Sequence, residues 1–282
     1  MSDVTIRMQT VKTDRLKYKL IAFSILALLL IVLAFFSESL CPYDPYEQNL
    51  AMAKAAPSAE HLLGTDRFGR DMLSRIIAGS YTSIFSTLLL VGFITVFGSL
   101  IGVLCAWSGR WIDTLLMRLA DMFLAFPGLV FALAVAAVLG GGVHNAILAL
   151  AAISWPKYAR LARSQALAQQ SAPYMQAAKM AGNSTFQMIR KHVLPNIAGP
   201  ILVTAMLDIG TMMMELAGLS FLGLGAKPPI PEWGSMMSDT RNLLATQPWV
   251  TLSPGVAIFV SVMVFNLLGD AVRDWLDPKN RR

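Results

Sequence analysis

Two acidic residues stand in an otherwise apolar stretch, LDIGTMMMELAG, at residues 207–218. Asp208 and Glu215 are seven residues apart, about two helical turns, so they would share one face of an α-helix. A charge at the centre of a membrane costs roughly 2.5–3.5 kcal/mol on insertion scales and usually faces a cavity or a partner. The pattern predicts an acidic stripe suited to a metal chelate, another cation or a peptide amino group. Pairing with a base on another subunit, or protonation, is the structural alternative.

Three methionines lie between these two acids. Met212 and Met213 are candidates for the same path because a thioether is a soft ligand for a transition metal. Methionine also fills gaps in hydrophobic cores, which is its more common role. No metal site is assigned, since Cys41 and Cys105 show neither a disulfide framework nor metal-ligand spacing.

A second candidate region is polar, basic and free of acids. It covers residues 176–196, reads QAAKMAGNSTFQMIRKHVLPN, and lies in a stretch without Asp or Glu at residues 122–207. Small residues at its bend would let the surface of another protein approach closely. The segment is therefore either a docking knob or an ordinary basic loop that lies on anionic lipid.

Local signals predict two short helices at right angles in this region. Gly182-Asn183 is a typical helix stop, and Asn183, Ser184 or Thr185 can cap the next helix. Pro195 is expected to end that second helix. The i, i+3, i+7 spacing places three residues on one apolar face: Phe186, Ile189 and Val193.

The composition is that of a membrane protein. The chain has 282 residues, 55% of them hydrophobic and only 14% charged, with a mean hydropathy of +0.57. Soluble domains are about a quarter charged. The net charge of +6 does not require nucleic acid as a partner, because basic residues gather on the cytoplasmic side of membrane helices. We predict an all-α polytopic membrane protein.

Six apolar blocks predict six transmembrane helices, because open backbone cannot cross lipid unsatisfied. They cover residues 20–36, 83–107, 111–139, 146–158, 197–224 and 252–268. Pro127 should kink the third block. The first is expected to be a retained anchor. The predicted units are a cytoplasmic tail (1–19), a first transmembrane helix (20–40), an extracytoplasmic segment (41–80), a core with five transmembrane helices (81–275) and a cytoplasmic tail (276–282).

The orientation follows from the basic residues, which gather in both tails and in the second-to-third and fourth-to-fifth connections. With six spans these four regions lie on one side, which the charge rule assigns to the cytoplasm. Both termini are then cytoplasmic. The outer segment at residues 41–79 would meet another protein or form an amphipathic interfacial helix.

The basic region resembles the "EAA" loop of ABC-importer permeases. The triplet is Gln176-Ala177-Ala178, and Gly182 follows four residues after its last alanine. The Leu194-Pro195 pair comes next, with its proline thirteen residues beyond Gly182. There are two departures: an amide replaces the acid of the triplet, so an ion pair made there in the family cannot be assumed, and a histidine stands where isoleucine is usual. The resemblance implies that ATPase coupling rests on Gln176, Ala177, Ala178, Gly182, His192, Leu194 and Pro195.

Four longer motifs look like the peptide/nickel branch of these importers, and specifically like its second permease subunit. They are HLLGTDRFGRDMLSRIIAGSYTS (61–83), ADMFLAFP (120–127), AGLSFLGLGAKPPIPEWG (217–234) and FNLLGDAVRDWLDPK (265–279). They occur in the right order, and the resemblance covers roughly residues 20–279.

The resemblance implies a type I ABC-importer permease fold in the bacterial cell membrane. It implies a heterodimer with a homologous permease subunit, two cytoplasmic ABC ATPases and an extracytoplasmic solute-binding protein. The chain has no GxxxxGK[ST] phosphate loop, so it should be a non-catalytic conduit without cofactors, and ATP and Mg would bind to the partner ATPases. The coupling loop would correspond to residues 164–196.

The substrate expectation comes from LDIGTMMMELAGLSFLGLG, which resembles the nickel or metal-chelate permeases more than the dipeptide ones. We therefore expect nickel or a metal held by a small chelator, with di- or oligopeptides as the alternative. A self-contained channel or secondary transporter is the rival of another class. The Ala/Gly–Leu-Pro spacing and the lack of inverted repeats argue against it.

Overall fold

The computed structural model describes the backbone of residues 2–276 and the side chains of residues 16–276. The predicted C-terminal tail at 276–282 lies, apart from its first residue, outside the described residues. No β-strand occurs in the described part, whose α-helices are α1 (Ser2–Phe35), α2 (Ser37–Leu40), α3 (Met72–Trp107), α4 (Gly109–Leu124), α5 (Gly128–Val138), α6 (Val143–Gln170), α7 (Pro173–Met180), α8 (Thr185–Met188), α9 (Leu194–Leu219), α10 (Trp233–Thr240) and α11 (Pro248–Leu276).

By length and composition, four helical stretches can cross a membrane: Leu16–Phe35, Met72–Trp107, Thr185–Leu224 and Pro248–Leu276. A fifth crossing results if α4 and α5 form one bent span. The kink predicted at Pro127 is present as a break of 93° between these two helices. The predicted span at 146–158 lies inside α6, and the count of six stays a prediction.

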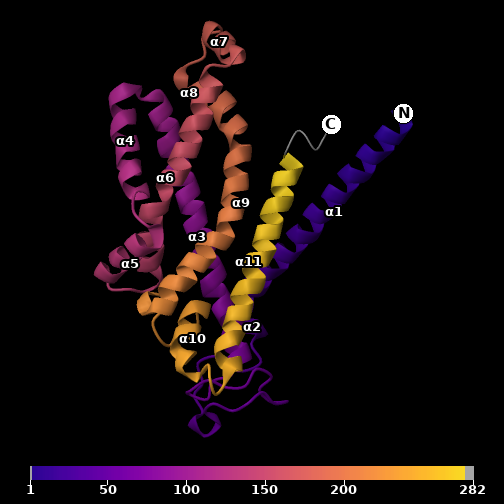
Figure 1. Ribbon diagram of the computed structural model, residues 1–282, viewed down its shortest axis with the longest axis vertical. Coiled ribbons are helices and arrows are strands. Elements are labelled where there is room, and N and C mark those ends of the chain that lie inside the picture. The colour runs from indigo at the N-terminus through magenta and orange to yellow at the C-terminus, as the bar shows by residue number, and fades with distance from the viewer. Residues whose placement is uncertain (1, 277–282) are drawn as a thin grey trace.

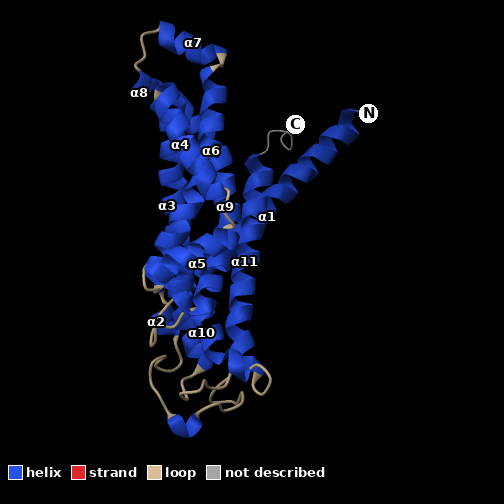
Figure 2. Cartoon of the chain, turned by 60° about the vertical axis from the view of Figure 1, so that its left-hand side comes forward, coloured by secondary structure: helices blue, strands red, loops and turns tan. Residues whose placement is uncertain are grey.

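The long helices run along the molecule, and the loops gather at one end (Figures 1 and 2). Helices α7 and α8, the N-terminal end of α1 and the C-terminal end of α11 lie at the other end (Figure 1). The ends that the charge bias places in the cytoplasm are therefore together in space, which is compatible with the predicted orientation.

Helices α3 and α6 approach each other most closely at two glycines four residues apart. A Cβ atom on Gly98 would lie 2.5 Å from the carbonyl oxygen of Trp155, and one on Gly102 would lie 2.3 Å from that of Ala159. Only glycine permits this backbone approach, a common device in membrane helix packing.

Helix α4 is held against α6 by two ion pairs. Arg163 contacts both carboxylate oxygens of Asp113 at 2.5 Å, and Arg160 pairs with Asp121. The two bases are three residues apart on α6, so both bonds lie on one side of that helix.

The outer segment is an ordered loop and not an amphipathic helix, so that alternative is wrong. Between α2 and α3 the only helical turn is the 3₁₀ turn Leu50–Met52. The buried Asp66 carboxylate accepts hydrogen bonds from the backbone N–H and the guanidinium of Arg70. Asp71 then caps α3 by accepting from the N–H of Ser74 at 2.8 Å. These local side-chain bonds offer the backbone an alternative to a helix.

Beyond α9, a π-helical turn (Ser220–Leu224) ends at Gly223, whose φ of 89° breaks the helix. The connection to α11 then folds back as α10. Glu232 caps α10, accepting from the N–H groups of Gly234 and Ser235 at 2.9 Å each. Its carboxylate is buried against α3, and this burial raises the pKa of Glu232.

Candidate functional site

The basic region forms a stiff helical bend at the end of the molecule that carries α7 (Figure 1). Gly182 has a φ of 82°, the left-handed conformation that favours glycine. Its N–H donates to the carbonyl of Lys179 at 3.1 Å, and the N–H of Asn183 donates to that of Ala178 at 3.2 Å. These two bonds are the Schellman motif that ends α7.

The second helix starts with a capping box. Of the three predicted caps, the structure selects Ser184, whose hydroxyl accepts from the N–H of Gln187 while the Gln187 side chain accepts from the N–H of Ser184. A helix stop and a helix start thus stand side by side, so the angle of the bend is set by hydrogen bonds.

Pro195 does not end the second helix, and that prediction is wrong. The chain stays helical from Thr185 to the end of α9 at Leu219, passing through a π-helical turn at Ile189–Val193, with Pro195 in the first turn of α9. Proline removes one backbone donor and its ring clashes with the carbonyl four residues earlier. The wider π turn just before Pro195 accommodates both effects. There are therefore not two separate short helices but one short helix, α7, and the beginning of a long one.

The bend exposes most of the residues assigned to coupling. Gln176, Ala177 and Gly182 are exposed, while Ala178 is buried. The Gln176 amide forms no hydrogen bond with the described residues. Leu194 and Pro195 are also exposed, and the half-buried His192 lies beside Tyr174 with ring centroids 6.1 Å apart.

Two exposed apolar side chains at this bend were missed as candidates. Met180 is 90% exposed and Phe186 is 70% exposed. The residues of the predicted apolar face therefore do not share one environment. Val193 is fully buried, whereas Phe186 points away from the chain's own core. Large apolar side chains at such exposure, flanked by Lys179 and Arg190, are typical of a surface that another protein covers.

In the membrane part, the structure separates the two acids of α9. Asp208 is buried and accepts hydrogen bonds from Lys157 Nζ at 2.5 Å and from the Tyr158 hydroxyl at 2.9 Å. Both partners lie on α6 of the same chain. The sequence hypothesis placed the base that pairs with Asp208 on another subunit, whereas the structure shows that it is Lys157 of the same chain. Its position inside an otherwise apolar span was the available signal.

Glu215 is half-buried and has no hydrogen bond or ion pair with the described residues. The two methionine candidates do not share its partly exposed face. Met212 and Met213 are 6% and 2% exposed and belong to the core, where the Met212 sulfur accepts from the Ser154 hydroxyl at 3.8 Å.

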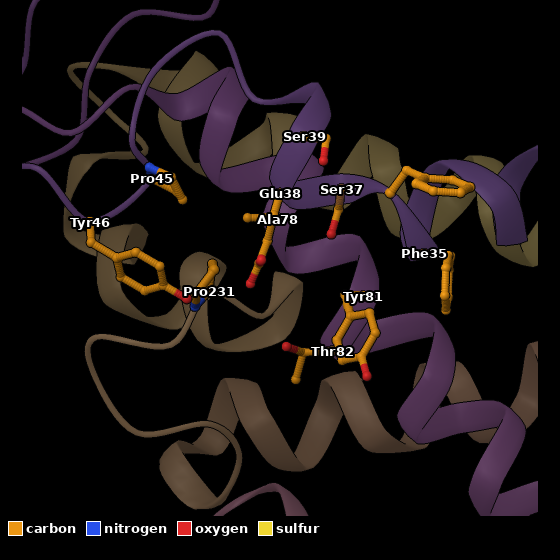
Figure 3. A pocket seen from close by; sticks show the side chains of 11 residues that line it. Phe35, Ser37, Glu38, Ser39, Pro45, Tyr46, Ala78, Tyr81, Thr82 and Pro231 are labelled. Atoms are coloured by element: carbon orange, nitrogen blue, oxygen red, sulfur yellow. The ribbon is translucent and has the colours of Figure 1, made fainter.

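At the opposite end of the molecule, a pocket of about 320 Å³ opens between α2, α3 and the outer loops (Figure 3). The Glu38 carboxylate points into it, between Pro231 and Tyr81 (Figure 3). Its polar lining also includes Ser37, Ser39, Tyr46 and Thr82. The pocket and the α7–α8 bend therefore lie toward opposite ends of the molecule (Figure 1).

Comparison with known proteins places these features in a family. The family described as "Binding-protein-dependent transport system inner membrane component" matches residues 98–282. The chain is 41% identical over 249 residues to the dipeptide transport system permease protein DppC of Alkalihalophilus pseudofirmus, covering 88% of this chain and 82% of that protein. It is 42% identical over 256 residues to the probable D,D-dipeptide transport system permease protein DdpC of Escherichia coli, covering 91% and 86%.

A third relative is the glutathione transport system permease protein GsiD of Pectobacterium atrosepticum, 38% identical over 260 residues, with 92% of this chain and 86% of that protein covered. Among solved structures, the MetNI methionine ABC transporter in an inward-facing conformation matches with a TM-score of 0.59 at 18% identity. That match covers 73% of this chain and 98% of the solved chain, and at this identity it shows the fold alone.

Proposed function

Because this chain belongs to the family of binding-protein-dependent transport system inner membrane components, we propose that it forms half of the translocation path of an importer for short peptides. The chain is a non-catalytic permease subunit of an ABC importer in the bacterial inner membrane, with the type I permease fold. We further propose which solute is transported, which proteins bind this chain and which residues contact each of them.

The relatives favour peptides over nickel. Their names state transport of dipeptides, D,D-dipeptides and glutathione, all of them compounds with peptide or peptide-like bonds. The expectation of nickel or a metal chelate, drawn from a short motif around α9, finds no support in these relatives. Met212 and Met213, which were to offer thioether ligands, are buried in the core.

We assign ATPase docking to the α7–α8 bend. The observation that carries this assignment is the pair of exposed apolar side chains, Met180 and Phe186, on a bend whose geometry is set by the Gly182 helix stop and the Ser184 capping box. A rigid, apolar, basic-flanked knob is suited to a hydrophobic groove on a partner. ATP and Mg would bind to two cytoplasmic ATPase subunits and not to this chain.

The other end of the molecule would receive the solute. We propose that the ordered outer segment at residues 41–71, with the pocket around Glu38, faces an extracytoplasmic solute-binding protein or the homologous permease subunit that completes the heterodimer. Both termini would then be cytoplasmic, with six spans if α6 is one of them.

Reconstitution tests the proposal. The chain is assembled in liposomes with its partner permease, ATPases and binding protein, and uptake of radiolabelled dialanine is compared with uptake of nickel with a chelator. Uptake of dialanine driven by ATP is expected. Uptake of nickel alone would contradict the peptide assignment.

Docking is tested with two matched variants in the same liposomes. Phe186→Ser should lower peptide-stimulated ATP hydrolysis by about tenfold or more, as for a central apolar contact of an interface. Val138→Ser removes a side chain that is 88% exposed on α5, outside both the bend and the outer segment, and should leave that hydrolysis unchanged. Equal effects of the two substitutions would contradict the docking assignment.

A further inference from the structure

Helix α9 has one face that the rest of the chain leaves uncovered. Thr211 and Met214 are exposed, Glu215 and Gly218 are partly exposed, and this i, i+3, i+4, i+7 spacing places all four on one side of the helix. A Cβ atom on Gly218 would have no neighbour within 4 Å, so the space beside it is open. The opposite side is packed in the core.

This face differs from the surfaces that meet lipid. On α11 the exposed side chains at membrane depth are Val256, Phe259 and Met263, and on α1 they are aliphatic and aromatic. The open face of α9 instead carries a carboxylate, a hydroxyl, a thioether and a glycine. A lipid-facing surface would leave the carboxylate without a partner in hydrocarbon, which is costly. The face therefore borders water, a ligand or another subunit.

Glu215 lies deep in the span. The predicted membrane segment at 197–224 has its centre near residue 210, so Glu215 is about 7 Å from that centre at 1.5 Å per residue. No base among the described residues forms an ion pair with its side chain. The charges that act on it are those of Asp208 and Lys157, and these two already neutralise each other in a 2.5 Å ion pair. The open face therefore carries a carboxyl group that has no partner among the described residues.

We propose that Glu215 binds the ammonium group of the transported peptide, whereas Asp208 is a structural partner of Lys157. The inference rests on the proposed function, since the ligand is the free amino end of a short peptide. The Thr211 hydroxyl, one turn away on the same face, supplies a neutral acceptor for a second N–H of that group. A permease that meets many peptide side chains can rely on this end group, because every unblocked peptide carries it.

Thiol labelling tests whether the site is open to water. In the assembled complex with Cys41→Ser and Cys105→Ala, Glu215→Cys is treated with a water-soluble cationic methanethiosulfonate, and Phe259→Cys serves as the lipid-facing control. The Glu215→Cys complex should be labelled faster than the control. Gly218→Cys, on the same face and with Glu215 retained, should also be labelled, because the space beside Gly218 is open, and dialanine supplied with binding protein and ATP should slow that labelling. Labelling no faster than the control would overturn the inference, because Glu215 would then face lipid or the sister subunit.

Uptake tests the recognised group and does not depend on the cysteine variant. Dialanine uptake is measured in competition with N-acetyl-dialanine, in wild type, Glu215→Gln and Asp208→Asn. Since the binding protein is the same throughout, its own preference cancels in each ratio of variant to wild type. Glu215→Gln should lower dialanine uptake about tenfold or more, the loss of one charge-assisted hydrogen bond. Asp208→Asn should keep the wild-type preference for the free amino end.

The outcomes separate this inference from the proposed function. If wild type imports dialanine but Glu215→Gln imports it equally well, the ammonium assignment fails and peptide import stands. If Gly218→Cys is labelled but dialanine never slows its labelling while wild type imports dialanine, the assignment fails in the same way. If wild type imports no peptide, the proposed function fails and the inference falls with it.

Discussion

Removal of the Asp208 carboxylate should destabilise the membrane domain by about 1–4 kcal/mol. In Asp208→Ala the hydroxyl of Tyr158, a fully buried residue, loses its acceptor, which costs about 1–3 kcal/mol. The Lys157 side chain is 53% exposed, so its unpaired charge is screened and adds only about 0–1 kcal/mol. Asp208→Asn keeps an acceptor for Tyr158 and should cost about 1 kcal/mol.

The assay is thermal unfolding of the detergent-solubilised complex, followed by intrinsic fluorescence. At roughly 2–4 °C per kcal/mol, Asp208→Ala should melt about 2–16 °C below wild type. Lys157→Met leaves the buried Asp208 carboxylate without its ion-pair partner and should also destabilise the fold.

A double-mutant cycle decides whether the two residues act as a pair. Lys157→Met combined with Asp208→Asn removes both charges together, so it should cost less than the sum of the two single changes, with a coupling of about 1–3 kcal/mol. Costs that add to within about 0.5 kcal/mol would refute the reasoning, and would mean that the ion pair contributes nothing to the fold.

Three further expectations concern other parts of the chain. Gly102→Ala should cost about 1–3 kcal/mol in the same melting assay, because its Cβ would meet the carbonyl of Ala159, whereas Gly92→Ala, with no neighbour within 4 Å, should be neutral or stabilising. Burial raises the pKa of Glu232, so the native state holds the proton of this carboxyl more tightly than the unfolded chain does. The melting temperature should therefore fall as pH rises above the ordinary pKa of about 4.3. Glu232→Gln should remove this part of the pH dependence. Gly182→Asn should retain peptide-stimulated ATP hydrolysis because Asn tolerates a positive φ, and Gly182→Val, β-branched, should lose most of it; equal rates would show that the φ of 82° is not needed.

Features that depend on local chemistry could be predicted from the sequence. The helix stop at Gly182, the break at Pro127 and the apolar helices follow from preferences within one or two turns, and the structure contains them. The end of the helix at Pro195 also rests on a local rule, but the rule assumes an α-helix. A π turn changes the position of the carbonyl that would clash with the ring, so the chain continues.

Contacts between distant segments could not be predicted. The partner of Asp208 lies 51 residues earlier in the chain, and only the packing of α6 on α9 brings the two together. The sequence hypothesis grouped Asp208 with Glu215 because both are acids on one face of a helix. Only the contact with α6 distinguishes them. The metal preference finds no support in the relatives, because a motif of a few residues around α9 carries less information than identity over about 250 residues.

The continuity of the helix through Pro195 connects the two candidate regions. Phe186 on the docking bend and Glu215 on the open face belong to one helical stretch, Thr185–Leu224, and are 29 residues apart, about 44 Å at 1.5 Å per residue. A helix that ended at Pro195 would place a flexible joint between them, and movement of the bend would be lost there. A continuous helix transmits displacement of one end to the other, which is the kind of rigid element that couples distant sites. We infer that an ATPase which shifts the α7–α8 bend also shifts Glu215, because both belong to the same helical stretch.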